Sequence, residues 1–280
     1  MTPSRSRRQP RRSSRRPEPS ARSHPERTDL MTEAKDDSPV GDVEIVVHPG
    51  KQELSDAIAA RLVTSIADAQ AARGVAHVSL TGGSLGSDLW ASVVALPARS
   101  AVDWSRVELW WGDERYLPAG DADRNDVQND AAGLASLPLD QARVHRVLGP
   151  DASDSAEASA AAYGEVMRAS GAGAFDVMIL GVGPDGHVAS LFPGHPAQQS
   201  VDAIAVAVHD SPKPPPDRVS LTFEALRRSR EVWFIVAGAD KAEAVANGVA
   251  GADPAVNSAA QVKGEQRTLW LIDKDAAENL

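Results

Sequence analysis

Apolar residues along the chain follow two alternating patterns. Short runs rich in Val, Ile, Leu and Trp predict strands that are buried on one or both faces. Between these runs, apolar residues recur every three or four positions, as on the buried face of a helix. The expected strands are 43–48, 75–80, 107–111, 144–147, 175–180, 201–208, 231–237 and 268–272, and the expected helices are 51–73, 87–95, 126–135 and 155–170, with two more after Thr222 and from Gly238. This alternation is typical of an α/β domain, so we expect a mostly parallel sheet with helices on both faces.

Charge is divided unevenly between the N-terminus and the rest of the chain. Residues 1–27 contain nine Arg and two Glu, a net charge of +7, whereas the rest of the chain carries −17. Residues 1–40 contain too few large apolar side chains to offset the entropy of an ordered chain. We therefore expect a disordered basic extension at 1–40 and one α/β domain at 41–280.

Three interpretations of this extension remain open. It could bind nucleic acid, direct import into an organelle, or be a passive addition with Met31 as a later start site. We favour the passive interpretation and do not expect a nucleic-acid partner.

The composition excludes several classes of protein. The chain has no cysteine, which excludes disulfides and thiol chemistry and fits a cytoplasmic protein. No apolar run approaches the ~20 residues of a membrane span, so no membrane partner is expected. No paired-histidine spacing and no calcium-type carboxylate loop is present, so we expect no metal. The oligomeric state is not evident from the sequence.

The richest candidate for chemistry follows the apolar run 175–180. Gly181, Gly183 and Gly186 form a tight turn that also contains Asp185 and His187. A buried strand that delivers polar groups to a glycine-rich loop is typical of an α/β active site. His187 is the natural proton carrier near neutral pH. The alternative is a polar turn with a solvated histidine.

Two further turns combine glycine or charge with a strand end. The Gly82-Gly83-Ser84 turn lies between a strand and a helix, and the three together form an anion site. The alternative is a turn that connects the two elements and binds no ligand. Asp113 and Arg115 follow the strand 107–111, and Arg115 can hold a phosphate or carboxylate with two hydrogen bonds, although a solvated salt bridge is the alternative.

Three later features complete the candidate set. Asn125 is a plausible N-cap for the helix at 126–135. Lys241 is expected in the first turn of a helix, where a cation opposes the helix dipole and therefore indicates an anionic partner. The proline-rich segment 210–217 predicts a stiff loop that can border a pocket.

The segment GVGPDGHVASLFPGH at 181–195 closely resembles the signature of the 6-phosphogluconolactonase family. Four other segments resemble the family in the same order, so the resemblance spans about residues 41–275. They are Gly-Gly-Ser at 82–84, Gly-Asp-Glu-Arg at 112–115, Arg-Val-Ser-Leu-Thr at 218–222 and the lysine at 241. The sequence departs from the family pattern at Leu85-Gly86, where Thr-Pro is common, and at Arg124, where Ser is usual.

The resemblance implies a Rossmann-like fold shared with ribose-phosphate isomerases and glucosamine-6-phosphate deaminases. It implies hydrolysis of 6-phospho-D-glucono-1,5-lactone, the second step of the oxidative pentose phosphate pathway, without a cofactor. His187 would be the general base, Asp185 would orient it, and Asp113 would orient a water or a sugar hydroxyl. Substrate and phosphate contacts would come from Gly82, Gly83, Ser84, Arg115, Asn125, Arg218 and Lys241.

Two rival functions remain open. An aminosugar-phosphate deaminase or isomerase of the same fold needs a positioned acid after the Asp-Gly-His turn, and residues 188–193 contain no carboxylate. A sugar-phosphate sensor that binds without turnover is disfavoured by the presence of His187 and Asp185. It is also disfavoured because residues 1–40 contain no convincing helix-turn-helix segment.

Overall fold

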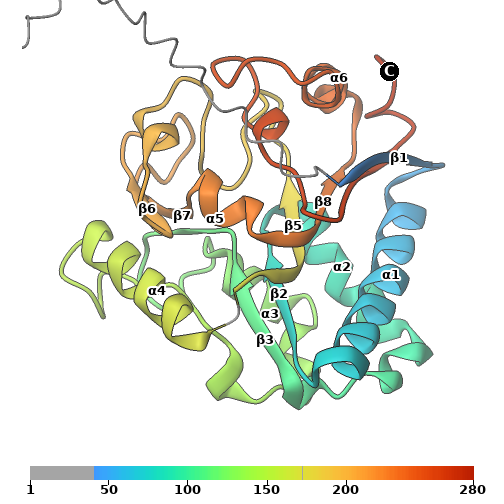
Figure 1. Cartoon of the computed structure of the whole chain (residues 1–280), viewed down its shortest axis with the longest axis horizontal. Helices are drawn as coiled ribbons and strands as arrows, with labels where there is room; N and C mark the ends of the chain where they lie inside the picture. Colours follow the sequence, from blue (N-terminus) through green and yellow to red (C-terminus); the bar gives the residue numbers. More distant parts are fainter. Residues whose placement is uncertain (1–40, 172) are drawn as a thin grey trace, which may run out of the picture. The chain divides into compact units, whose positions relative to one another are not determined.

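A parallel sheet forms the centre of the domain (Figure 1). Its six strands lie in the order β1-β9-β8-β5-β2-β3, and every neighbouring pair is parallel. The strands are β1 Asp42–His48, β2 Ala76–Leu80, β3 Val107–Trp111, β5 Phe175–Gly181, β8 Ser229–Val236 and β9 Arg267–Asp273. The computed structural model describes residues 41–171 and 173–280, so the extension predicted at 1–40 lies outside the described residues.

The strand β5 shows why the central strands are continuously apolar. Val177 and Ile179 pack into the hydrophobic core on one face of the sheet, and Met178 and Leu180 pack into the core on the other face. All four side chains are almost completely buried. A strand covered on both faces has no polar side, and this confirms the predicted parallel sheet.

Helices cover both faces of the sheet, as predicted (Figure 1). One face carries α1 (Lys51–Arg73) and α2 (Gly83–Ala95). Side chains of α4 (Ala156–Ser170), α5 (Phe223–Arg227) and α6 (Ala242–Val249) belong to the core on the other face. No helix within 41–171 and 173–280 is long and apolar enough to cross a membrane.

A second sheet lies on the α4 side and was not predicted. Its strands β4 (Asp113–Arg115), β7 (Arg218–Leu221) and β6 (Ala205–Val208) are antiparallel. The carbonyl of Gly112 accepts the Leu221 N–H at 2.8 Å, so β4 leaves the parallel sheet directly after β3. Because β4 is short and charged, it has no apolar periodicity that would reveal a strand.

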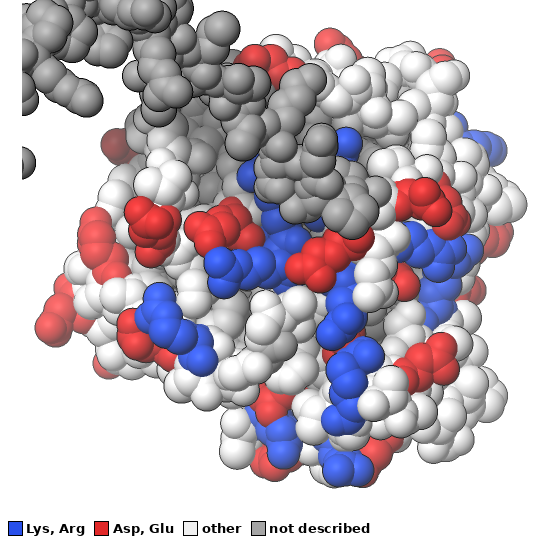
Figure 2. Space-filling model, in the orientation of Figure 1, with Lys and Arg blue, Asp and Glu red and all other residues white. Residues whose placement is uncertain are grey.

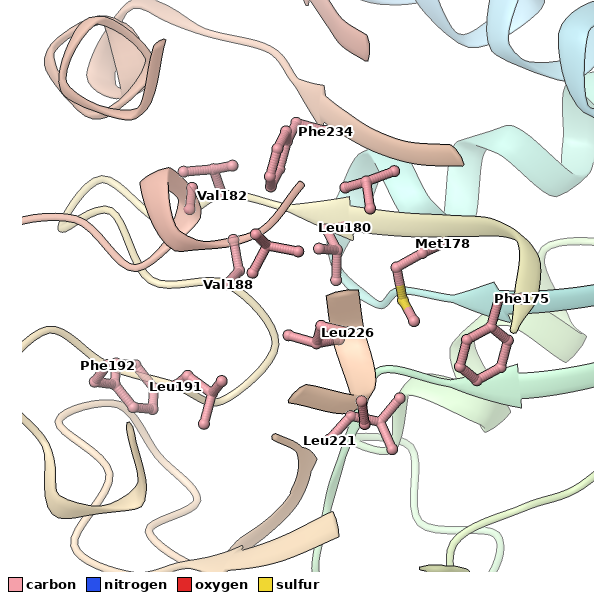
Figure 3. Close-up of a cluster of buried hydrophobic side chains, with 14 of the residues drawn as sticks. Phe175, Met178, Leu180, Val182, Val188, Leu191, Phe192, Leu221, Leu226 and Phe234 are labelled. Carbon is pink, nitrogen blue, oxygen red and sulfur yellow. The ribbon is translucent and has the colours of Figure 1, made fainter. Parts of the chain in front are cut away.

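The loop after β5 is anchored in the core (Figure 3). Val188, Leu191 and Phe192 are each at most 2% exposed, and an isolated bridge joins Val188 to Leu191. His187 therefore lies on a loop whose next residues are fixed by packing, and not on a free surface turn.

Several predicted boundaries were wrong. The strand expected at 144–147 is only an isolated bridge between Val144 and Leu109. The strand expected at 201–208 begins at Ala205. The helix expected at 87–95 begins four residues earlier, at Gly83, and the one expected at 126–135 is α3 (Asn125–Ala131). Glycine and polar residues in a first turn weaken the apolar pattern that marks a helix start.

Candidate active site

A cleft of about 360 Å³ opens beyond the carboxyl ends of β2, β3, β5 and β8. From β2 the chain crosses to β3 on one side, and from β5 it crosses to β8 on the other, so the connections diverge between β2 and β5. Open α/β sheets bind ligands at such a point. Nine of the ten predicted site residues line the cleft: Gly82, Gly83, Ser84, Asp113, Arg115, Asn125, His187, Arg218 and Lys241.

The tenth predicted residue, Asp185, contacts the site through His187. Asp185 Oδ1 lies 2.5 Å from His187 Nδ1, and no described residue hydrogen-bonds His187 Nε2. A carboxylate on Nδ1 fixes the imidazole orientation and leaves Nε2 available to accept a proton. Burial opposes ionisation of Asp185, but the hydrogen bond and charge of His187, together with Lys213, outweigh burial and hold the pKa of Asp185 below its usual value.

The glycines around this pair are required for steric reasons. A Cβ on Gly183 would lie 2.1 Å from the His187 ring atoms Cε1 and Nδ1. The Gly183 N–H also donates to the His187 carbonyl at 2.9 Å. Gly186 has φ +79°, and a Cβ there would lie 2.5 Å from the side-chain nitrogen of Asn257. The turn therefore packs its own backbone against the imidazole.

The Gly-Gly-Ser turn is the N-terminus of α2. The first N–H groups of a helix have no intrahelical acceptor, and because the N-cap residue is Gly82, no N-cap side chain accepts them either. A Cβ on Gly83 (φ +78°) would meet nothing within 4 Å. Free N–H groups and the positive end of the helix dipole favour an anion here. At Gly86, which departs from the family pattern, a Cβ would lie 2.6 Å from the Thr81 carbonyl oxygen, so glycine lets the helix pack closely.

Asp113 and Asn125 present oxygen atoms to the cleft from neighbouring positions. Asp113 Oδ2 accepts the Ser190 hydroxyl at 2.6 Å and lies 3.9 Å from Arg218 Nη1. Asn125 Nδ2 donates to the Asp113 carbonyl at 2.9 Å. Asn125 Oδ1 is buried and has no hydrogen-bond partner among the described residues. This amide oxygen can therefore accept a hydrogen bond from a ligand hydroxyl.

Asn125 is not the N-cap of α3. Arg124 holds that position, and the cap is supplied by Glu114, whose carboxylate accepts the N–H groups of Asn125 and Asp126 at 2.7 and 2.9 Å. Burial and the neighbouring Asp126 raise the pKa of Glu114, while Arg124 and the two N–H donors oppose that rise. The sequence did not reveal this role because Glu114 lies eleven residues before the helix that it caps.

Arg124, the second departure from the family pattern, has a structural role. Its guanidinium is buried and bonds the Asp126 carboxylate at 2.9 and 3.1 Å. It also donates to the carbonyls of Leu117 and Val147 at 2.9 and 2.7 Å. Arg124 does not line the cleft.

Arg218 lines the cleft, but most of its donors are used within the protein. Nε donates to the Pro215 carbonyl at 3.2 Å, and Nη2 donates to the carbonyls of Lys213 and Pro214 at 3.1 and 3.2 Å. Nη1 makes only the longer contacts to Ser190 Oγ, at 3.5 Å, and to Asp113. Arg218 therefore anchors the proline-rich loop, and little donor capacity is left for the phosphate contact that was predicted.

Lys241 lies at the N-cap of α6, whereas the sequence predicted it in the first turn of that helix. Its Nζ lies 3.0 Å from Asp240 Oδ2, so its anionic partner in the structure is the preceding residue. The helix-dipole argument for a ligand is therefore weaker, although Lys241 still lines the cleft.

Lys213 is a charged residue of the cleft that was not predicted as a site residue. Lys213 lines the cleft beside Pro214, so the proline-rich loop does border a pocket, as predicted. Its Nζ lies 3.5 Å from Asp185 Oδ1. The only signal in the sequence is a lysine between prolines, which does not show where the side chain lies. Within 41–171 and 173–280, no group of three or more His, Cys, Asp or Glu side chains could hold a metal ion.

Comparisons with known proteins agree on one family. The family model described as glucosamine-6-phosphate isomerases/6-phosphogluconolactonase matches residues 49–270. A curated 6-phosphogluconolactonase of Streptomyces coelicolor is 51% identical over 85% of this chain and 94% of its own length. That of Mycobacterium tuberculosis is 44% identical over 84% and 98%. The solved 6-phosphogluconolactonase of Trypanosoma brucei has a TM-score of 0.74 at 27% identity and covers 86% of this chain and 99% of its own.

Proposed function

Because the chain belongs to the family of glucosamine-6-phosphate isomerases and 6-phosphogluconolactonases, we propose that it hydrolyses 6-phospho-D-glucono-1,5-lactone to 6-phospho-D-gluconate. This is the second step of the oxidative pentose phosphate pathway. The observation that carries the proposal is the hydrogen bond of 2.5 Å between Asp185 and His187, beside a cleft that also contains the N-terminus of α2. Water is the only second reactant in this proposal, and none of its steps uses a cofactor.

His187 acts as the general base in this proposal. Its Nε2 removes a proton from water while the water oxygen attacks the lactone carbonyl carbon. The electron pair of the C=O bond moves to the carbonyl oxygen. When that pair returns, the bond from the carbonyl carbon to the ring oxygen breaks, and His187 gives its proton to the ring oxygen. Asp185 holds the imidazole in place and stabilises its positive form.

The phosphate end of the substrate binds away from His187. The free N–H groups of Gly83 and Ser84 in the first turn of α2, the N-cap Gly82 and the ammonium of Lys241 provide positive potential for the phosphate. Asp113 and the free oxygen of Asn125 accept sugar hydroxyls. When the phosphate is bound away from the reacting carbon, it holds that carbon next to His187. The binding energy of the phosphate thus orients the substrate for reaction.

Arg115 also takes part in substrate binding in this proposal. Its Nη1 donates to the Asp123 carbonyl at 2.5 Å, which orients the guanidinium at the wall of the cleft. Nε of Arg115 has no hydrogen-bond partner among the described residues. That free donor can contact a substrate oxygen.

The deaminase alternative is less consistent with the cleft. Ring opening and proton shuttling need a free carboxylic acid. Among the described residues that line the cleft, Asp113 is the only carboxylate, and Ser190 and Arg218 already hold it. A solved glucosamine-6-phosphate deaminase has a TM-score of 0.71 at 19% identity, which shows a common fold and does not favour that reaction.

Acid release from freshly generated 6-phospho-D-glucono-1,5-lactone tests the proposal. The protein should increase the rate well above spontaneous opening, and it should release no ammonia from glucosamine 6-phosphate. An unchanged rate of lactone opening would contradict the proposal. If the protein bound the lactone tightly without turnover, the sensor alternative would be correct.

The remaining expectations on partners and location stay predictions. On the described part of the face in Figure 2, Lys and Arg side chains lie beside Asp and Glu and do not form one continuous basic surface. Nucleic-acid interfaces are usually basic over a whole patch, so this face does not favour such a partner. Cytoplasmic location is predicted only from the cysteine-free composition.

A further inference from the structure

We infer that Lys213 stabilises the negative charge that develops on the lactone carbonyl oxygen, and that Arg218 positions the loop that carries Lys213. The inference rests on the proposed lactone hydrolysis. It changes the expected role of Arg218 from phosphate ligand to positioning residue and adds a cation that the sequence did not reveal.

The place of Lys213 beside the catalytic pair is the first observation. Its Nζ lies 3.5 Å from Asp185 Oδ1, and the same oxygen lies 2.5 Å from His187 Nδ1. The side chain of Lys213 is 41% exposed, and it has no other partner among the described residues. A contact of 3.5 Å is too long for a strong hydrogen bond. The ammonium is therefore held near the reacting end of the cleft while it can still donate to a substrate oxygen.

The rigidity of the loop is the second observation. Arg218 is 5% exposed, and it binds the carbonyls of three successive loop residues, Lys213, Pro214 and Pro215. Its guanidinium also lies 5.7 Å from the centre of the Phe192 ring, which is buried in the core. Because the Arg218 guanidinium makes these hydrogen bonds, it holds the backbone of the loop, and with it Lys213, in one position.

The base of the loop is closed by separate contacts. The Ser211 N–H donates to the Pro216 carbonyl at 3.0 Å. Outside this pair, His209 lies two residues before Ser211 and Asp217 lies one residue after Pro216, and His209 Nδ1 is 2.7 Å from Asp217 Oδ1. The two ends of residues 211–216 are thus held together, so little backbone conformational entropy is lost when Lys213 contacts substrate.

The other described cations of the cleft are less suited to this role. Lys241 forms an ion pair with Asp240 at 3.0 Å, and the N–H groups of Arg218 donate to carbonyls of the loop. Arg115 donates to the carbonyl of Asp123. Of these four cations, Lys213 is the one that forms an ion pair with Asp185, the partner of His187. A donor aimed where charge develops lowers the barrier without tightening ground-state binding.

The Lys213→Met variant tests the inference in the full chain. It should lower kcat for the lactone about 100-fold, the usual effect of removing one donor to an oxyanion, with KM changed less than about threefold. Lys213→Arg should recover at least about tenfold of the loss. Affinity for D-glucitol 6-phosphate, which has the phosphate and hydroxyls but no carbonyl, should stay within about twofold. The matched control is Lys263→Met at an exposed site outside the cleft, which should behave as the unmodified protein.

Three outcomes would overturn the inference while lactone hydrolysis by the unmodified protein stands. One is a kcat of Lys213→Met within about threefold of normal. Another is a raised KM and weaker D-glucitol 6-phosphate binding at normal kcat, which would make Lys213 a phosphate ligand. The third is a lowered thermal midpoint with no recovery in Lys213→Arg, which would make its role structural. If the unmodified protein did not open the lactone, the proposed function itself would fail first.

The role of Arg218 is tested by combining variants. Arg218→Met should lower kcat, and adding Lys213→Met should lower it little further, because residues that act as a unit are strongly non-additive. Independent, multiplicative losses would contradict the positioning role. If Arg218→Met does not fold, Arg218→Lys serves in the same comparison, because lysine cannot reproduce the planar fork of bonds.

Discussion

At the residue scale, the space beside the His187 ring decides which side chain residue 183 can carry. A Cβ on Gly183 would lie 2.1 Å from two ring atoms, so an alanine must push the imidazole away. Gly183→Ala should lower kcat about 100-fold, because a shift of about 1 Å in a catalytic group has that effect. Its thermal midpoint should change little, because the turn lies at the open cleft. Initial rates and thermal unfolding measure the two effects.

The last residue of β5, directly before this loop, offers a matched control. Gly181→Ala would place its Cβ 3.6 Å from Thr81 Oγ1, an ordinary contact, and should keep nearly normal kcat. Equal losses in both variants would show that the backbone of the loop, and not the position of His187, limits the rate.

At the scale of elements, the histidine at the base of the proline-rich loop links it to α4. His209 lies 2.7 Å from both Asp217 and Glu157. These hydrogen bonds, first from Asp217 and then from Glu157, raise the pKa of His209. The hydrogen bond with His209 in turn lowers the pKa of Glu157 to about 2.

The sign of the pH dependence follows from these shifts. The bridge of His209 stabilises the fold fully below the unfolded histidine pKa of about 6.5 and is lost as the pH rises through the higher folded pKa. His209→Gln should therefore lower the thermal midpoint more at pH 6 than at pH 9. Because these groups are exposed, the difference should be a few degrees at most. A gap that is equal at both pH values would contradict the protonated bridge.

The elements also show what a single sequence can predict. The central strand β5 was predicted from its continuous apolar run, and the helices α1 and α4 from positions that recur every three or four residues, because both patterns follow directly from burial. The strands β4 and β7 were missed, since three or four residues with charges carry no period. Their antiparallel pairing joins segments about 100 residues apart in the chain, so it is a property of the whole fold.

The candidate site divides in the same way. The glycine-rich turns and His187 stand out locally, because glycine and histidine have distinctive chemistry. Lys213 and Glu114 do not stand out, since their partners lie far away in sequence: Asp185 is 28 residues before Lys213, and Asn125 is eleven after Glu114. The sequence predicted Arg218 at the substrate site, but it could not show that the guanidinium donates to carbonyls of residues 213–215.

At the scale of the whole molecule, the basic residues 1–40 should not contribute to catalysis. All predicted site residues lie within residues 82–241, so a chain that begins at Met31 should keep kcat/KM within about twofold. The passive interpretation also predicts no salt-sensitive retention on DNA by the full chain. Retention at low salt that disappears in the shorter chain would contradict it and favour a nucleic-acid arm.

The central claim is that His187, held by Asp185, removes the proton of the attacking water. The most direct measurement is kcat of His187→Ala on freshly generated 6-phospho-D-glucono-1,5-lactone, corrected for spontaneous opening. The account predicts a loss of at least about 100-fold, with affinity for D-glucitol 6-phosphate preserved. Turnover close to that of the unmodified protein would contradict it.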